Sequence, residues 1–278
     1  MVTVDRGVTT IPEYKSDASA LRPVALLLDL DGTLYTGGAP IPGAPALLTR
    51  LRSRGVPFRL VTNTTSRSRS MLVERLRGYG FETAPEEIFT ATLAGAAAVR
   101  AAGHRVVAPF LPAAALEDLA GLQLSGGVAG AARSRPEVVL LGDLGQGWSY
   151  ALLQEAFEHL MAGAELVALS RDRYFQQGDG LALDAGPFVA ALEYATGRTA
   201  RVAGKPSSDF YAAALASLGV SGPAAMVGDD LWSDVEGAQR AGLAGWLVRT
   251  GKFREEVLRT SGIRPDRILS SVAALAEE

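Results

Sequence analysis

Residues 24–34 read Val-Ala-Leu-Leu-Leu-Asp-Leu-Asp-Gly-Thr-Leu, an apolar run that leads into two acidic residues and a glycine. The run from Val24 to Leu30 lies between a proline and an Asp-Gly pair and is too short for an independent helix. Such a run is typical of a β-strand that is buried on both faces of a parallel sheet. We therefore expect Asp29 and Asp31 at the carboxyl end of a buried strand.

Further short apolar runs alternate along the chain with stretches of helical character. They span residues 57–62, 138–141, 166–169, 224–228 and 245–248. This alternation predicts an α/β fold with a Rossmann-like parallel sheet flanked by helices. In sheets of this kind the functional groups gather at the carboxyl ends of the strands, where loops from different strands converge.

Length and composition set broad limits on the protein. A chain of 278 residues fits one compact domain or a core with a second module, at about 150 residues per domain. Hydrophobic residues make up 48% and charged residues 21%, so a sizeable core is available. The net charge of -3 argues against a nucleic-acid partner, because it offers no broad positive field.

Cysteine and histidine are rare in this chain. The sequence has no cysteine, which removes disulfides, thiolate nucleophiles and cysteine-bound zinc. Its two histidines, His104 and His159, lie far apart without ligand spacing. We expect both at the surface of a helix or loop, and neither a histidine metal site nor a catalytic triad is expected.

The N-terminal segment and the longest apolar runs bear on location. No apolar run approaches the roughly 18 residues that a membrane span requires. Residues 1–22 mix charges with glycine and proline and are expected to form a flexible tail, with no hydrophobic signal core. The sequence therefore predicts a soluble, cytoplasmic protein without a membrane partner.

The acidic pair at the end of the first strand carries a chemical signal. Asp29 and Asp31 are spaced by two, so in an extended strand their carboxylates point to the same side and repel each other. A divalent cation would offset that repulsion. A simple turn is the alternative, since Asp and Gly favour turns.

The second strand ends in Thr62-Asn63 and is followed by several hydroxyl residues. Ser66 is expected to cap a helix that runs toward Gly78. A hydroxyl and free amides at a helix N-terminus form an anion site. Asn63 is the only asparagine in the chain. A capped helix without a ligand is the alternative, because such caps are common.

A lysine motif, Gly204-Lys205-Pro206-Ser207, precedes a helical stretch at 209–218. Of the 27 basic residues only three are lysines, so the basic positions of this chain default to arginine. A compact ammonium group fits among phosphoryl oxygens and carboxylates in a way that a wide guanidinium does not. This difference gives a reason for lysine at position 205, with chance as the alternative.

The last motif is an apolar run that ends in a glycine and clustered acids, Gly228-Asp229-Asp230, with Asp234 shortly after. A turn followed by a capped helix would use the same residues. Combined with the first acidic pair, however, Asp229 supplies oxygen ligands from a second strand end. Oxygen ligands of this type are those that Mg²⁺ prefers.

In this order the four motifs resemble the haloacid dehalogenase superfamily of phosphohydrolases, over nearly the whole chain from Pro23 onward. By this resemblance Asp29 is the nucleophile, Asp31 the general acid and base, and Lys205 the charge clamp. The resemblance also makes Asp29, Asp229 and the main-chain carbonyl of Asp31 the ligands of a Mg²⁺ cofactor.

The resemblance implies roles for the remaining motif residues as well. Thr62 and Asn63 are expected to bind the phosphate group. Asp230 and Asp234 are further acidic positions beside the metal ligands, and Asp234 is expected to steady Lys205 or a bound water.

The segment 91–196 resembles the C2-type cap of this superfamily, an inserted α/β domain that covers the catalytic crevice. The expected division is a catalytic core formed by 23–90 and 197–278, with the cap between them. A polar stretch of the cap offers candidate substrate contacts, with an ordinary surface loop as the alternative. These candidates are Arg171, Arg173, Tyr174 and Asp179.

The cap and the segment 248–253 are similar to those of phosphatases of phospholysine, phosphohistidine and inorganic pyrophosphate. They are also similar to those of haloacid dehalogenase-like hydrolase domain-containing proteins. These relatives carry serine where this chain has Asp31. An intact acid and base at this position would make ordinary phosphomonoesters more accessible, because their alkoxide leaving groups need a proton.

We therefore expect a Mg²⁺-dependent phosphohydrolase that cleaves a small phosphorylated metabolite through an aspartyl phosphate. Pyrophosphate, phosphohistidine or phospholysine are the alternative substrates. A phosphotransferase and a non-catalytic regulatory protein that binds phosphorylated ligands are alternatives of other classes. Caps of this type often pair in relatives, so the resemblance also allows a homodimer.

Overall fold

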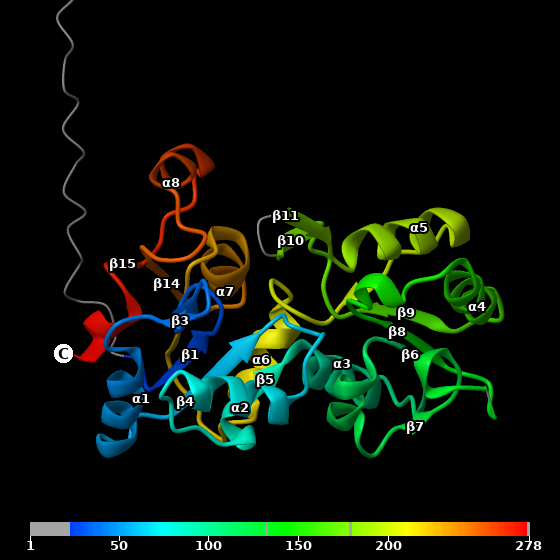
Figure 1. The fold of residues 1–278 in the computed structure, drawn as a ribbon, viewed down its shortest axis with the longest axis horizontal. Coiled ribbons are helices and arrows are strands. Elements are labelled where there is room, and N and C mark those ends of the chain that lie inside the picture. Colours follow the sequence, from blue (N-terminus) through cyan, green and yellow to red (C-terminus); the bar gives the residue numbers. More distant parts are fainter. Residues whose placement is uncertain (1–22, 132, 178–179, 277–278) are drawn as a thin grey trace, which may run out of the picture.

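A computed structural model describes residues 23–131, 133–177 and 180–276 of the chain. It contains two larger parallel sheets, one of six strands and one of five, that lie side by side with helices around them (Figure 1). The predicted α/β class and the parallel sheet flanked by helices are confirmed. The predicted N-terminal tail, residues 1–22, lies outside the described residues.

The six-stranded sheet has the order β15-β14-β13-β1-β4-β5, and all its neighbouring strands are parallel. Its strands are β1 Ala25–Asp29, β4 Phe58–Thr62, β5 Ile88–Thr90, β13 Ala224–Gly228, β14 Ala244–Val248 and β15 Arg267–Leu269. The apolar run that opened the sequence forms β1, which lies at the centre of this sheet between β13 and β4.

Helices cover both faces of this sheet because β1 is apolar on both. Leu26 and Leu28 pack with α1 (Ala44–Ser53) and α2 (Arg69–Gly78), whereas Leu27 packs on the opposite face with α6 (Ser208–Ala216). Two further helices belong to this part of the chain, α7 (Gly237–Arg240) and α8 (Glu255–Ser261). We call this sheet with its helices the core.

The five-stranded sheet has the order β12-β9-β8-β6-β7 and is also parallel throughout. Its strands are β6 Val106–Phe110, β7 Gln123–Leu124, β8 Val138–Leu141, β9 Glu165–Ala168 and β12 Arg201–Val202. One face packs on α4 (Tyr150–Met161) and α5 (Gly186–Thr196), and the other packs on α3 (Ala91–Ala101). We call this sheet with α4 and α5 the cap; its last strand, β12, follows residue 196, where the predicted insert ends.

Several short elements complete the structure. Two antiparallel hairpins are formed by β2 (Tyr35–Thr36) with β3 (Ala39–Pro40) and by β10 (Tyr174–Gln177) with β11 (Gly180–Leu183). Short 3-10 turns are η1 Pro85–Glu87, η2 Ala113–Leu119, η3 Gly127–Ala129, η4 Gly145–Gly147 and η6 Val272–Ala276, and η5 (Leu231–Glu236) is a π-helical turn. Among the described helices, none is long and apolar enough to cross a membrane.

The carboxyl ends of the two sheets face each other. The main-chain N–H of Asp143, just after β8, donates to the Thr65 hydroxyl, just after β4, at 2.8 Å. Just after β12, Gly204 lies so close to the Asn63 side chain, which follows β4, that a Cβ at this glycine would overlap the Asn63 Oδ1. Loops from both sheets therefore meet at one crevice, as expected for strand ends in parallel sheets.

The predicted N-cap of the second helix is wrong. Helix α2 begins at Arg69, and the hydroxyl of Ser68, not that of Ser66, accepts a hydrogen bond from the Met71 N–H at 3.2 Å. Several hydroxyl residues precede this helix, and a cap needs an extended backbone directly before the first turn. Ser68 has that conformation, with φ −74° and ψ 163°.

Candidate active site

Three buried carboxylates meet at the carboxyl edge of the core sheet. Asp29 ends β1, Asp229 directly follows β13, and Asp234 lies in η5 after that strand. Each offers an oxygen within 4.8 Å of the others, although the residues are only 7%, 3% and 1% exposed. The strands β1 and β13 are parallel neighbours, which brings the first two residues to the same edge.

Lys205 places its ammonium group among these acids. Its Nζ lies 2.5 Å from Asp29 Oδ1 and 2.7 Å from Asp234 Oδ1, and the residue is 4% exposed. Burial alone would lower the pKa of Lys205, but Asp234 and Asp29 together raise it well above its usual value. The lysine is therefore a fixed positive charge beside the proposed nucleophile.

Both oxygens of the Asp234 carboxylate accept hydrogen bonds from the protein. Its Oδ1 accepts from Lys205, and its Oδ2 accepts from the Asp230 main-chain N–H at 3.0 Å. A Cβ at Gly228 would overlap this carboxylate, so the glycine permits its close approach. This geometry supports the expectation that Asp234 steadies Lys205.

The acidic cluster carries more negative charge than the lysine balances. Burial raises the pKa of Asp29 well above its usual range, with Asp234 and Asp229 adding to the rise and Lys205 opposing it. Burial together with Asp234 raises the pKa of Asp229 to about 7. Three carboxylates, which are hard oxygen ligands, face a single ammonium group. This arrangement fits a divalent cation, which would keep the acids ionised.

Asp31 is exposed and does not belong to the buried cluster. Its Oδ2 accepts a hydrogen bond from the Tyr35 hydroxyl at 2.9 Å. Tyr35 is buried beneath the Arg75 guanidinium, which lies 4.8 Å from the centre of its ring. Tyr35 was not among the predicted site residues, because an aromatic residue four positions after an acid carries no signal of its own.

The two predicted phosphate-binding residues have different surroundings. The Thr62 hydroxyl accepts from the Thr64 N–H at 3.0 Å, which leaves its own proton free to donate. The Asn63 amide forms two hydrogen bonds with the Lys205 main chain, from Nδ2 to the carbonyl at 2.9 Å and from the N–H to Oδ1 at 2.8 Å. Asn63 therefore holds the lysine segment against the end of β4.

The candidate substrate contacts of the cap have partners within the cap. The Arg171 guanidinium forms an ion pair with Glu193 of α5 at 2.6 Å. The Arg173 guanidinium lies 5.9 Å from the centre of the Tyr174 ring, and Tyr174 is exposed. Asp179 lies outside the described residues. Among the residues that the structure describes, no contact joins these arginines to the acidic cluster.

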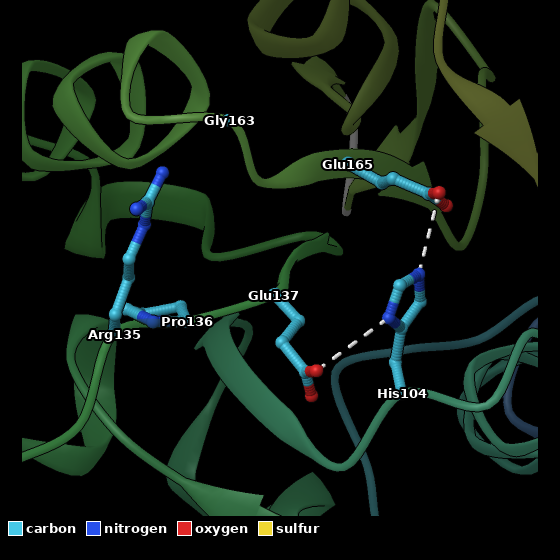
Figure 2. Close-up of a pocket in the computed structure, with 6 residues that line it drawn as sticks. All are labelled: His104, Arg135, Pro136, Glu137, Gly163 and Glu165. Carbon is cyan, nitrogen blue, oxygen red and sulfur yellow. Dashed lines mark ion pairs between the residues drawn. The ribbon is translucent and has the colours of Figure 1, made fainter.

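A separate pocket lies at the opposite edge of the cap sheet. Its cavity measures about 260 Å³ and is lined by His104, Arg135, Pro136, Glu137, Gly163 and Glu165. Figure 2 shows His104 between Glu137 and Glu165, with nitrogen–oxygen distances of 3.8 and 3.3 Å. Glu137 precedes β8 and Glu165 begins β9, so this pocket lies at the amino ends of the strands and away from the crevice.

Comparisons with known proteins agree along the chain. A family model described as haloacid dehalogenase-like hydrolase matches residues 26–124. A second model, described as HAD-hydrolase-like, matches residues 202–275. The two matches include all four of the motifs that supply the acidic cluster, the lysine and the Thr62-Asn63 pair.

Individual relatives and solved structures cover most of the chain. Human haloacid dehalogenase-like hydrolase domain-containing protein 2 is 42% identical over 233 residues, which is 83% of this chain and 85% of that protein. Human phospholysine phosphohistidine inorganic pyrophosphate phosphatase is 34% identical over 255 residues, 89% of this chain and 91% of that protein. A glycerol phosphate phosphatase from Mycobacterium tuberculosis, solved in complex with magnesium, superposes with a TM-score of 0.80 at 33% identity, covering 91% of this chain and 76% of that one.

Proposed function

The chain belongs to the haloacid dehalogenase-like hydrolases, and from this premise we propose that it is a Mg²⁺-dependent phosphatase of a small phosphorylated metabolite. The resemblance inferred from the four motifs is confirmed, and with it a phosphatase that acts on phosphoester substrates. The observation that carries the finer proposal is the meeting of Asp29, Asp229 and Lys205 in one buried cluster.

The proposed Mg²⁺ is held by Asp29, Asp229 and the main-chain carbonyl of Asp31. When bound, the ion supplies positive charge that neutralises the phosphoryl oxygens. The excess of carboxylates over ammonium groups in the cluster supports such an ion. Asp234 is left out of this ligand set, because both its oxygens already accept hydrogen bonds from the protein.

The chain's own residues perform the covalent step. Lys205 withdraws charge from the phosphoryl group, and the Thr62 hydroxyl donates a hydrogen bond to it. An oxygen of Asp29 then attacks phosphorus in line with the leaving oxygen. The bond between phosphorus and the leaving oxygen breaks as the bond to Asp29 forms, which gives an aspartyl phosphate.

Asp31 is the general acid when the aspartyl phosphate forms and the general base when it is hydrolysed. It donates a proton to the leaving oxygen, and once ionised it takes a proton from the water that attacks the aspartyl phosphate. The products are free phosphate and regenerated Asp29. The exposed position of Asp31 supports this role, since the leaving group and the attacking water both enter from the crevice. Tyr35 holds its carboxylate through one oxygen.

Phosphomonoesters of alcohols are the proposed substrate class. An alkoxide leaves only when it is protonated, and the carboxyl group of Asp31 supplies that proton. Two relatives are named for other substrates, one as a phospholysine phosphohistidine inorganic pyrophosphate phosphatase and one as a glycerol phosphate phosphatase, and these substrates should be tested as well. The proposed partner is therefore a small molecule, and the net charge of -3 supports the absence of a nucleic-acid partner.

The test is phosphate release from a panel of sugar phosphates, glycerol phosphate, pyrophosphate and phosphoamino acids. Wild-type protein with Mg²⁺ is expected to hydrolyse the esters, whereas Asp29→Asn and chelated wild-type protein are not. Equal turnover by Asp29→Asn and wild type would remove Asp29 as the nucleophile. Phosphate recovered on an added alcohol instead of in solution would indicate transfer to an acceptor.

A further inference from the structure

The loop that follows β14 contacts the acidic cluster through its main chain. The main-chain N–H of Lys252 donates to Asp229 Oδ2 at 2.6 Å. The hydroxyl of Thr250 donates to the carbonyl of Gly32, in the loop after β1, at 2.5 Å. The residues Thr250–Lys252 therefore join the loop after β1 to the acid that follows β13.

Two glycines enclose the Asp229 carboxylate. Gly251 has φ +57°, and a Cβ there would overlap this carboxylate and press on the Gly32 backbone. Gly32 has φ +87°, and a Cβ there would overlap the same carboxylate. The carboxylate thus lies between two loops that only glycine allows to approach so closely. The Thr250 hydroxyl closes the contact between these loops.

The side chain of Lys252 fixes the neighbouring acid. Its Nζ lies 2.9 Å from Asp230 Oδ2. The other oxygen, Asp230 Oδ1, accepts from the N–H groups of Trp232 and Ser233 at 3.0 and 3.1 Å. The loop therefore holds both residues of the Asp229-Asp230 pair, one through its main chain and one through its ammonium group.

We propose that Thr250–Lys252 is a positioning clamp that orients the Asp229 carboxylate toward the metal ion. The Lys252 N–H occupies Oδ2, which leaves Oδ1 as the oxygen for the ion. The packing of Gly251 and Gly32 prevents the carboxylate from rotating away. This inference rests on the proposed metal site, and it adds residues that act on Asp229 without touching the substrate. Loss of a group that orients a metal ligand typically costs about 10- to 100-fold in metal affinity or activity.

Substitutions in the clamp test this role. Gly251→Ala forces a methyl group against the carboxylate, and Thr250→Val removes the hydroxyl while keeping the shape of the side chain. Thr250→Ser retains the hydroxyl and serves as the conservative rescue. Gly262→Ala is the matched control for the glycine, since Gly262 also has a positive φ, +78°, but a Cβ at this position would meet nothing within 4 Å.

The measurement is Mn²⁺ binding to the resting protein by electron paramagnetic resonance, with Asp229→Asn as the reference for a lost site. Gly251→Ala and Thr250→Val are expected to weaken Mn²⁺ binding by about tenfold or more. Thr250→Ser and Gly262→Ala are expected to bind within about twofold of wild type. Thr250→Val keeps the test decisive if Gly251→Ala does not fold.

The outcomes separate the clamp from the proposed function. Wild-type affinity in both Gly251→Ala and Thr250→Val overturns the clamp and leaves the phosphatase proposal intact. The proposed function is wrong if the wild-type protein binds Mn²⁺ through Asp229 but hydrolyses none of the phosphate esters. In that case the Mn²⁺ affinities of the variants still test the clamp. A wild-type protein that binds no Mn²⁺ overturns the clamp as well.

Discussion

The strands of both parallel sheets end at the same crevice, but the side chains at those ends differ in burial and in charge. In the core, Asp29, Asp229 and Lys205 are at most 7% exposed; Asp29 offers an oxygen within 4.8 Å of one on Asp229 and forms an ion pair with Lys205. In the cap, the residues after β8 and β9 include Asp143, which is half-buried, and Asp172, which is exposed. The same architecture therefore gathers buried acids around a buried cation in the core, whereas these two acids of the cap are half-buried or exposed.

The two regions also differ in the charged groups that surround their acids. In the core, Lys205 forms ion pairs with two carboxylates. In the cap, burial together with Asp172 and Asp143 raises the pKa of Asp184 to about 6, and a main-chain N–H of Ala185 opposes the rise. Burial thus raises the pKa of an acid in both regions, and in the core the Lys205 ammonium opposes that rise through a direct ion pair with Asp29.

The largest contrast is expected between two ion pairs, one in each region. Lys205→Met should lower kcat/KM for the best phosphate ester by about 10³-fold, because the charge beside the transferring phosphoryl group is lost. Arg171→Met, which breaks the exposed pair with Glu193, should change kcat/KM by less than about threefold. Steady-state kinetics on both variants checks this. A loss in Arg171→Met as large as that in Lys205→Met would place a cap arginine in the reaction.

The second prediction concerns the exposed acid of the core. Asp31→Asn should lower kcat/KM by about 10²-fold for an alkyl phosphate, whose leaving oxygen needs a proton. The same variant should lose far less with p-nitrophenyl phosphate, because p-nitrophenolate leaves without one. The ratio of the two losses is the measurement. Equal losses with both substrates would contradict the role of Asp31 as general acid.

The third prediction tests the junction between core and cap. Asp118 in η2 is buried and accepts from the Arg69 guanidinium at 2.6 Å and from the Thr90 hydroxyl at 2.8 Å. Asp118→Ala should lower the free energy of unfolding by about 2 kcal/mol, since it leaves a buried hydroxyl and a partly buried cation without this partner. The exposed helical pair of Glu236 with Arg240 is the control.

Urea denaturation gives both values. Glu236→Ala should shift the free energy of unfolding by less than about 0.5 kcal/mol, as surface pairs commonly do. Two equal shifts would show that the buried contact at the junction adds nothing beyond an ordinary surface pair.

The smallest expected effect is the pH dependence of the cap. Because the folded protein raises the pKa of Asp184 to about 6, it binds this proton more tightly than the unfolded chain does. The free energy of unfolding therefore falls as the pH rises from about 4 to about 6, and the loss persists above that range. Asp184→Asn should raise the free energy of unfolding at pH 8 by about 1 kcal/mol after solvent screening, and should leave it unchanged at pH 4.

Urea denaturation of Asp184→Asn and wild type at both pH values checks this prediction. Stabilisation of the same size at pH 4 and pH 8 would assign the effect to packing and not to ionisation.

Apolar runs predicted the central strands of both sheets well. The runs at 224–228 and 138–141 coincide with β13 and β8, and the opening run forms β1. The apolar runs did not predict the remaining strands of the two larger sheets, β5, β6, β7, β12 and β15. Strand β6 contains Pro109, and β5 and β12 span only three and two residues, so a short or proline-bearing segment lacks the pattern on which the prediction depends.

The predicted site residues come together at the crevice to differing degrees. Asp29, Asp229, Asp234 and Lys205 share the buried cluster, whereas Asp31 is exposed beside it. The candidate arginine Arg171 pairs within the cap. Strand ends can be inferred from sequence because a buried strand has a composition of its own, but the direction of a surface loop depends on what packs against it.

Local sequence was enough to predict that Asp29 and Asp229 lie at the ends of two buried strands, because apolar runs and acidic motifs are local features. How those groups are held became visible only in the folded chain. The Asn63 amide is hydrogen-bonded to the main chain of Lys205, 142 residues away in the sequence. The Thr250 hydroxyl donates to the carbonyl of Gly32, 218 residues away. Contacts of this kind arise when distant loops pack at one sheet edge, and no local pattern encodes which main-chain atom will lie opposite.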